Sequence, residues 1–257
     1  MISMKNLKLS LLILFTFTTF SSFAAPFCVA HRALGFGELE NSYAAIEAAA
    51  RSGAKAIEFD LLHTKDNETI IYHDDELDRL VEKSVDCPTG SKISSINTEN
   101  LKNCKLSNGE LVPTFSETME MLANYDSMLF IELKDKFTDQ DLSVIMKTFP
   151  NRSDKIVIIS FNQSLLKSIK SLRESTPYLN GVKLVLVKKT AFGADTDSFD
   201  GLDTGLISKR KVKKLKKQGK LVGVYTKNSS NSIKNALKKD VNFITTNEYQ
   251  LCEDLTK

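Results

Sequence analysis

Three carboxylates stand in apolar stretches of the chain, where charged side chains are uncommon. Glu58 and Asp60 are two residues apart in the run AIEFDLL, so an extended strand points both side chains to one face. Glu132 occupies a second apolar run, MLFIELK. Carboxylates gathered on a buried face repel one another unless a cation lies between them, and their oxygens suit Mg²⁺ or Ca²⁺. The three residues predict a site for one divalent metal ion, although the Glu58 and Asp60 pair alone fits a solvated rim or a salt bridge to lysine equally well.

Two of the chain's three histidines, His31 and His73, lie at the ends of similar apolar runs, VAHR and IIYHD. The imidazole ring titrates near neutrality, so two histidines facing one phosphorus atom can divide the work of general base and general acid. Arg32 and Lys134 add a guanidinium and an ammonium group suited to phosphate oxygens. His63, just past the acidic pair, is expected to have a structural role, because a single histidine is more often structural than catalytic.

The elements that must position these residues alternate along the chain. Strands are expected at 27–30, 56–61, 69–72, 128–133, 156–160, 182–187, 221–225 and 241–245, and helices at 42–52, 115–124, 139–149, 163–175, 208–218 and 230–239. Such alternation implies a parallel sheet covered by helices, and the number of strands approaches the eight of a closed barrel. A further strand is expected around 202–207, in a poorly patterned stretch. A doubly wound open sheet is the alternative, but no glycine-rich phosphate loop follows the first strand.

The first residues differ from the rest of the chain. Lys5 and Lys8 precede an uncharged apolar run at 9–20, and small residues follow at Ser22 and Ala24, a pattern typical of a secretory signal peptide. We therefore expect residues 1–24 to be a signal peptide and residues 25–257 to be one exported domain, periplasmic or secreted. An uncleaved membrane anchor is the alternative, although the run is short for a span of about 20 residues. Without the two lysines, 33 basic residues face 32 acidic ones, and this balance indicates no nucleic-acid partner.

Four cysteines form an even set in a chain predicted to be exported, and none has the spacing of a metal site. Disulfides are therefore expected. Cys87 and Cys104 flank one short glycine-containing stretch and are paired first, which leaves Cys28 with Cys252, although three pairings are possible in principle.

Short motifs recur in a fixed order along the chain: HR at 31–32, ENS at 40–42, GA at 53–54, IEFD at 57–60, TKD at 64–66, HD at 73–74, LDR at 77–79, VPTF at 112–115 with Glu117, IELK at 131–134, SF at 160–161 and VYT at 224–226 with Asn228. One HR or HD pair means little, but the ordered series closely resembles the glycerophosphodiester phosphodiesterase family. The resemblance extends over nearly all of residues 25–257.

This resemblance implies a TIM-like (β/α)8 barrel with its active site at the C-terminal ends of the strands. It implies cleavage of glycerophosphodiesters, such as glycerophosphocholine and glycerophosphoethanolamine, to glycerol 3-phosphate and an alcohol. Its site residues fall at fixed positions of this chain: His31 and His73 for acid–base catalysis, Glu58, Asp60 and Glu132 for one Mg or Ca ion, and Arg32, Lys134, Glu40, Asn41, Phe161 and Tyr225 for the substrate or its supporting contacts. Residues 75–112 resemble the family's small insertion, so a Cys87–Cys104 disulfide would staple a cap beside the active-site mouth.

Two positions depart from the family pattern. Tyr225 stands where tryptophan is usual, which bears on the head group, because tyrosine stacks on a choline-like ammonium less strongly. Asn247 stands where aspartate is usual.

The same barrel supports rival interpretations. A phospholipid-cleaving enzyme of the sphingomyelinase D or phosphatidylinositol phospholipase C type would need an apolar rim, whereas 91–108 is polar. A non-catalytic binding protein would not need the complete set of histidines and carboxylates. No obligatory protein partner is evident, and the lysine-rich stretch at 209–220 is either a solvated helix face or a contact with anionic lipid.

Overall fold

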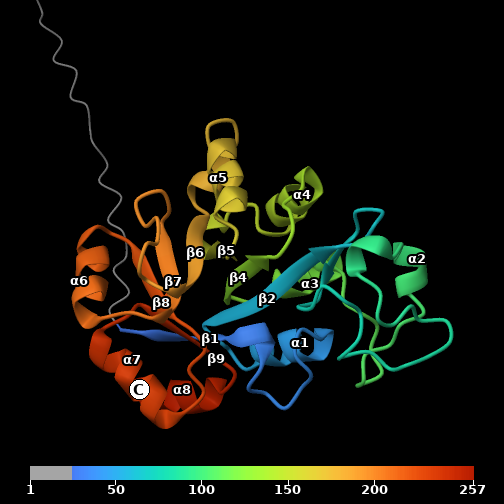
Figure 1. Cartoon of the computed structure of the whole chain (residues 1–257), viewed down its shortest axis with the longest axis horizontal. Helices are drawn as coiled ribbons and strands as arrows, with labels where there is room; N and C mark the ends of the chain where they lie inside the picture. The colour runs from blue at the N-terminus through green and yellow to red at the C-terminus, as the bar shows by residue number, and fades with distance from the viewer. Residues whose placement is uncertain (1–24) are drawn as a thin grey trace, which may run out of the picture.

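A closed barrel of parallel strands forms the centre of the molecule in the computed structural model, which describes residues 25–257. Within these residues, eight of the nine strands make the barrel: β1 (Phe27–Ala30), β2 (Ala56–His63), β4 (Met128–Leu133), β5 (Ile156–Ser160), β6 (Lys183–Thr190), β7 (Gly201–Leu206), β8 (Leu221–Val224) and β9 (Phe243–Thr246). Strand β1 pairs with both β2 and β9, which closes the ring (Figure 1). The short strand β3 (Thr69–Ile71) adds antiparallel to β2. The TIM-like barrel predicted from the sequence is confirmed.

Inward-facing side chains fill the barrel, because successive residues of a strand point to opposite faces. At the N-terminal end of the strands they are apolar, and the rings of Phe130 and Phe243 lie 4.9 Å apart. Gly223 on β8 leaves room for this packing, since a Cβ there would lie 2.1 Å from the Phe243 ring. Toward the C-terminal end the same inward positions turn polar: Phe130 is followed by Glu132 on β4. The barrel interior therefore carries its chemistry at one end.

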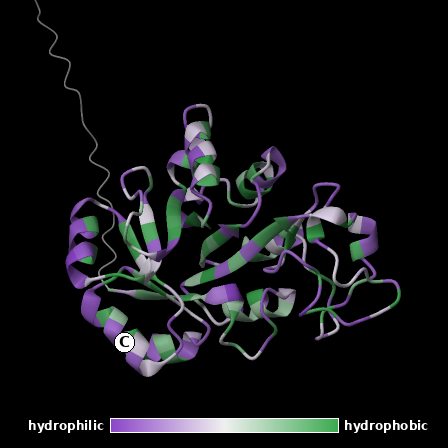
Figure 2. Ribbon diagram, viewed as in Figure 1, coloured by the Kyte–Doolittle hydropathy of each residue, from purple (hydrophilic) through white to green (hydrophobic). Residues whose placement is uncertain are grey.

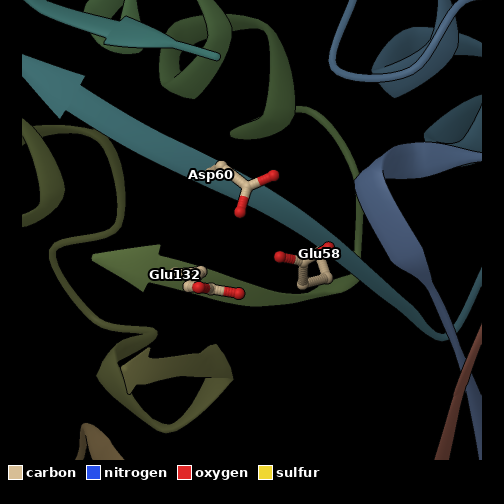
Figure 3. A group of neighbouring side chains, drawn as sticks. All are labelled: Glu58, Asp60 and Glu132. Carbon is tan, nitrogen blue, oxygen red and sulfur yellow. The ribbon is translucent and has the colours of Figure 1, made fainter. Parts of the chain in front are cut away.

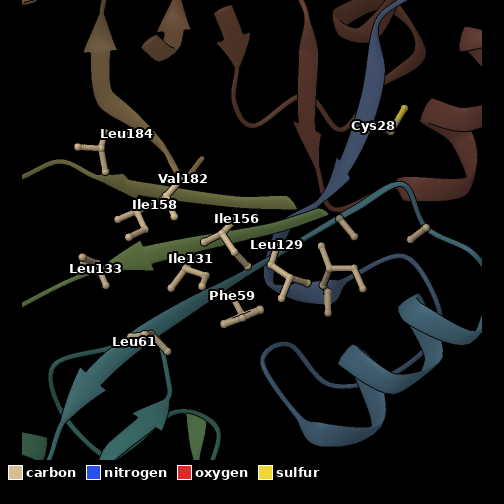
Figure 4. Close-up of a cluster of buried hydrophobic side chains, with 14 of the residues drawn as sticks. Cys28, Phe59, Leu61, Leu129, Ile131, Leu133, Ile156, Ile158, Val182 and Leu184 are labelled. Atoms are coloured by element: carbon tan, nitrogen blue, oxygen red, sulfur yellow. The ribbon is translucent and has the colours of Figure 1, made fainter. Parts of the chain in front are cut away.

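Helices cover the outside of the barrel. They are α1 (Tyr43–Arg51), α3 (Phe115–Leu122), α4 (Asp139–Thr148), α5 (Gln163–Leu172), α6 (Lys209–Lys217), α7 (Ser230–Lys239) and α8 (Tyr249–Thr256). The outward residues of β2, β4 and β5, including Phe59, Ile131 and Ile158, form the layer between strands and helices (Figure 4). Hydroxyl or amide side chains cap most helix N-termini, as Ser42 caps α1 by accepting from the N–H of Ala45. Each such cap typically stabilises a fold by about 1 kcal/mol.

The stretch between β3 and α3 packs into a small cluster of its own at one side of the barrel, where α2 (Thr98–Leu101) lies (Figure 1). Leu77, Ile93 and Leu106 are buried in it. The disulfide Cys87–Cys104 links two loop segments of this stretch, which has little regular structure.

The second disulfide, Cys28–Cys252, joins β1 to α8 with 6.0 Å between the Cα atoms. Both disulfides therefore have the pairing expected from the sequence. The predicted signal peptide, residues 1–24, lies outside the described residues. From residue 25 onward, no helix combines the length and the apolar character needed to cross a bilayer.

Candidate active site

The three predicted metal ligands meet inside the barrel. Glu58 and Asp60 project from β2 toward Glu132 on β4 (Figure 3), and one carboxylate oxygen of each lies within 4.8 Å of the others. The register explains the meeting, because Asp60 pairs directly with Glu132 across the two strands. All three side chains are buried, with Glu132 the most exposed at 7%. The spacing read from the sequence therefore does bring the carboxylates together.

This cluster holds more negative charge than its neighbours balance. Lys134 Nζ lies 2.8 Å from Asp60 Oδ1 and 2.6 Å from Glu132 Oε1. Burial raises the pKa of Asp60, but Lys134, His73 and the hydrogen bond from Asn41 together outweigh it and lower the pKa. Burial and repulsion by the other two carboxylates raise the pKa of Glu58 well above its usual value, and burial and Asp60 raise the pKa of Glu132 to about 7. Within residues 25–257, Glu58 Oε1 has no hydrogen-bond partner. An oxygen-only donor set with surplus charge and a free buried oxygen fits a hard divalent cation.

The turn after β1 supports two of these ligands. Arg32 donates its backbone N–H to Glu58 Oε2 at 2.7 Å, and Asn41 donates its side-chain amide to Asp60 Oδ2 at 2.8 Å. Both Arg32 and Asn41 have left-handed backbone conformations, with φ of 52° and 56°, which non-glycine residues adopt at a cost. Asn41 is buried, so its amide supports the carboxylate of Asp60 from behind. The two residues with strained backbone are thus the ones that orient the carboxylates of Glu58 and Asp60.

A chain of ion pairs joins the turn after β1 to the loop after β3. Glu40 Oε1 accepts from Arg32 Nη1 at 2.9 Å and from Arg79 Nη2 at 2.6 Å. Arg79 Nε in turn lies 2.9 Å from Asp74 Oδ2, and Asp74 Oδ1 lies 2.6 Å from Nδ1 of His73. Glu40 is thereby engaged with two arginines and orients the guanidinium of Arg32. This pairing also fixes the ring of His73 relative to the mouth of the barrel.

The two candidate catalytic histidines have different partners. His31 Nδ1 lies 2.7 Å from Asn247 Oδ1, and an amide oxygen only accepts, so Nδ1 carries the hydrogen and Nε2 keeps its lone pair. Burial is the main reason that the pKa of His31 lies below its usual value. His73 instead meets the carboxylate of Asp74, whose pKa is lowered against its own burial by His73 and Arg79. One ring thus has a neutral partner and the other an anionic one.

His63 is held away from this group. It is buried, with Nδ1 2.8 Å from Asp135 Oδ1 and Nε2 3.0 Å from Asp141 Oδ2. Burial lowers the pKa of His63, but the two carboxylates outweigh it and raise the pKa to about 9. Thr69 also donates to Asp141, at 2.6 Å. His63 ties β2 to the start of α4, which agrees with the structural role expected for it.

Sequence reasoning missed Asp203, which lies on β7 inside the barrel. It is 2% exposed, it accepts from Thr245 Oγ1 at 3.2 Å, and its Oδ1 has no hydrogen-bond partner in the part of the chain that the structure describes. Burial raises the pKa of Asp203 to about 7. Two predicted substrate contacts, Tyr225 and the half-exposed Phe161, pack edge to face with ring centroids 5.8 Å apart. The acidic residue in the run GLDTGL was the one signal that could have revealed Asp203.

Comparisons with known proteins agree with this geometry. The sequence model of the Glycerophosphoryl diester phosphodiesterase family matches residues 31–251. The glycerophosphodiester phosphodiesterase of Caldanaerobacter subterraneus is 29% identical over 151 residues, 56% of this chain and 61% of that protein. Glycerophosphodiester phosphodiesterase 1 of Homo sapiens is 27% identical over 145 residues, 52% of this chain and 42% of that protein. These alignments thus span about three fifths and two fifths of the relatives.

Solved structures share the fold. A putative glycerophosphoryl diester phosphodiesterase from Silicibacter pomeroyi superposes with a TM-score of 0.77 at 17% identity, covering 90% of this chain and 93% of that one. An Oleispira antarctica phosphodiesterase in complex with the product sn-glycerol-3-phosphate superposes with a TM-score of 0.73 at 20% identity, covering 90% and 96%.

Proposed function

Because the chain belongs to the glycerophosphoryl diester phosphodiesterase family, we propose that it hydrolyses glycerophosphodiesters, such as glycerophosphocholine and glycerophosphoethanolamine, to glycerol 3-phosphate and an alcohol. The observation that carries the proposal is the meeting of three buried carboxylates, one partly buried lysine and two differently partnered histidines at one end of the barrel. The product bound in the Oleispira antarctica complex, sn-glycerol-3-phosphate, is the kind of product that we propose for this chain.

Glu58, Asp60 and Glu132 would hold one divalent ion, Mg²⁺ or Ca²⁺. Such an ion, when bound, neutralises phosphate charge and lowers the pKa of a nearby hydroxyl group. Lys134 and Arg32 would bind phosphate oxygens from the positions in which Asp60 and Glu40 hold them.

The histidines would divide the proton transfers. His31 would take the proton of the attacking hydroxyl at Nε2, since burial lowers the pKa of the ring and the contact with Asn247 occupies Nδ1. His73 would give a proton to the leaving alkoxide, since the carboxylate of Asp74 lies 2.6 Å from its Nδ1 and fixes the orientation of the ring. The attacking hydroxyl belongs either to water or to the glycerol of the substrate, and the P–O bond to the alcohol breaks as the new P–O bond forms. Attack by water gives glycerol 3-phosphate directly, whereas attack by the glycerol hydroxyl gives a cyclic phosphate that a water molecule then opens to glycerol 3-phosphate.

Phe161 and Tyr225 would contact the head group of the substrate. Phe161 is 46% exposed and its ring lies against Tyr225, so the pair offers an aromatic wall at the mouth. Such a wall suits a choline-like ammonium. We also propose that the protein is exported, as its leader-like first residues and two disulfides suggest.

The test is release of glycerol 3-phosphate from glycerophosphocholine and glycerophosphoethanolamine, with sphingomyelin and phosphatidylinositol assayed in parallel. Glu58→Gln should abolish turnover, whereas Glu99→Gln, on the exposed surface of α2, should not change it. Turnover of the intact lipids with none of the glycerophosphodiesters would replace this function with the phospholipid-cleaving one.

A further inference from the structure

An apolar groove lies at the C-terminal ends of β6 and β7, the same end of the barrel as the candidate active site. Its walls include Phe192, Leu206 and Lys211, and its volume is about 460 Å³. Phe192 is 95% exposed and Leu206 is 64% exposed. A backbone hydrogen bond from Ala191 to Leu206, at 3.1 Å, continues the pairing of the two strands to this point. Ordered backbone here holds two large apolar side chains out in water, and adjacent exposed groups of this kind are typical of an interaction surface.

Helix α6 borders this groove with an unusual concentration of positive charge. Its sequence is KRKVKKLKK, and the helix is mostly hydrophilic in Figure 2. Of its residues, only Val212 and Leu215 are buried. In residues 25–257, the one ion pair made by this helix is between Lys216 and Asp240, at 2.9 Å. The exposed cations without an ion-pair partner among the described residues are Lys209, Arg210, Lys213, Lys214 and Lys217.

The positive charge at the start of α6 does not stabilise the helix. The first turn of α6 has three basic residues and no acidic one, whereas the helix dipole favours acidic groups at that end. Like charges one turn apart, such as Lys209 and Lys213, also repel each other. Lys214, Lys216 and Lys217 lie in the last turn, where the dipole favours positive charge, so it is the basic residues of the first turn that weaken the helix. A negatively charged partner outside the chain would offset the repulsion among these exposed cations.

Nearby acidic residues do not neutralise most of the positive charge of α6. Asp195 and Asp200, in the loop that joins β6 to β7, pair instead with Lys167 at 3.5 Å and Arg173 at 2.6 Å. The remaining acidic residue of the loop is Asp197. The cations of α6 therefore face solvent beside the exposed Phe192.

From this juxtaposition we propose that Phe192, Leu206 and the exposed cations of α6, the docking patch, bind the barrel mouth to an anionic phospholipid surface. The apolar side chains enter the interface between head groups and acyl chains, and the cations lie at the level of the lipid phosphates. A bilayer matches both parts of the patch at once. The proposal goes beyond hydrolysis of a soluble diester, which needs no membrane.

Vesicle cosedimentation tests the proposal. The N-terminus of the purified protein is first determined by mass spectrometry. The protein is then mixed with vesicles of pure phosphatidylcholine, or with vesicles in which about one third of the lipid is phosphatidylglycerol. Lys209→Glu/Lys213→Glu should weaken binding to the anionic vesicles roughly tenfold or more. The matched control, Lys234→Glu/Lys238→Glu, makes the same charge change at the same spacing on α7 and should weaken it much less.

Phe192→Ser should also reduce anionic binding, by roughly tenfold, because an inserted ring is lost. All variants should keep the activity of the wild type on soluble glycerophosphocholine, so that loss of docking is separate from loss of function. Equal binding to neutral and anionic vesicles, or equal losses in the α6 and α7 variants, would overturn the proposal. So would sedimentation velocity showing that Phe192→Ser dissociates a dimer while vesicle binding is unchanged, since a second copy of the chain would then cover the patch.

Discussion

Replacing Asn247 with aspartate should raise the pKa of His31 and move the acidic limb of the pH–rate profile upward. In the wild type, Asn247 Oδ1 and His31 Nδ1 are 2.7 Å apart, and the partner is neutral. Asn247→Asp keeps the size of the side chain and the acceptor oxygen but adds a negative charge beside a ring that is mostly buried. An opposite charge within about 4–6 Å favours the charged form of a group by about 1–3 pKa units.

This shift has a definite sign for activity. A general base must be unprotonated, so a higher pKa of His31 means that more of the enzyme is inactive on the acidic side. At a pH one unit below the wild-type limb, a shift of about one unit should reduce kcat/KM by roughly tenfold further. Well above the limb, the variant should equal or exceed the wild type, because a more basic imidazole accepts a proton more readily.

The assay is kcat/KM for glycerophosphocholine across pH at saturating divalent metal, so that the carboxylates stay ionised. Asn247→Ala is the control, since it removes the hydrogen bond without adding charge and should lower the rate with no upward shift of the acidic limb. Coincident acidic limbs in the wild type and Asn247→Asp would refute the assignment of His31 as the base.

Three further predictions concern the metal, the acid and the fold. Adding Mg²⁺ or Ca²⁺ to metal-stripped protein should raise its melting temperature and restore activity lost to chelation, and Glu58→Gln should abolish the thermal shift; full turnover after exhaustive chelation would exclude the metal. His73→Ala should lose about 10²- to 10⁴-fold in rate on glycerophosphocholine but much less on a p-nitrophenyl diester, whose leaving group needs no proton, whereas His31→Ala should fail on both; equal losses on both substrates would contradict the division of roles. The pKa of His63 is raised to about 9, so its protonated ring stabilises the folded protein. This stabilisation is complete below about pH 6.5 and is lost as the pH rises through 9. The free energy of unfolding should fall over that range by up to roughly 3 kcal/mol in urea titrations, and His63→Gln should flatten the fall.

The barrel could be predicted from the sequence because most of its strands are continuous apolar runs. The strand β7 was the least visible, since its inner face reads Gly201, Asp203 and Gly205, and its only large apolar residues are Leu202 and Leu206 on the outer face. Gly201 is required there, because a Cβ would lie 2.4 Å from the carbonyl oxygen of Leu221. A strand with this composition has neither the alternation nor the apolar run by which strands are identified, so Asp203 was hidden with it.

The metal cluster could be predicted because its spacing is local, whereas the partners of the histidines could not. Glu58 and Asp60 need only the period of a strand to share a face. His31 and Asn247 are 216 residues apart, and they meet because β1 and β9 pair to close the barrel. Asn247 stood out in the sequence as a departure from the family pattern, but its contact depends on closure of the ring.

The Cys28–Cys252 disulfide makes a covalent circle of nearly the whole described chain, with 224 residues of sequence separation between its ends. A pull applied to residues 25 and 257 would be carried through the sulfur–sulfur bond and would extend only the short tails outside Cys28 and Cys252. The strands, helices and active site between the two cysteines would bear none of the load. A single proteolytic cut within the circle would likewise leave one connected molecule, so the barrel should resist both stretching and nicking until the disulfide is reduced.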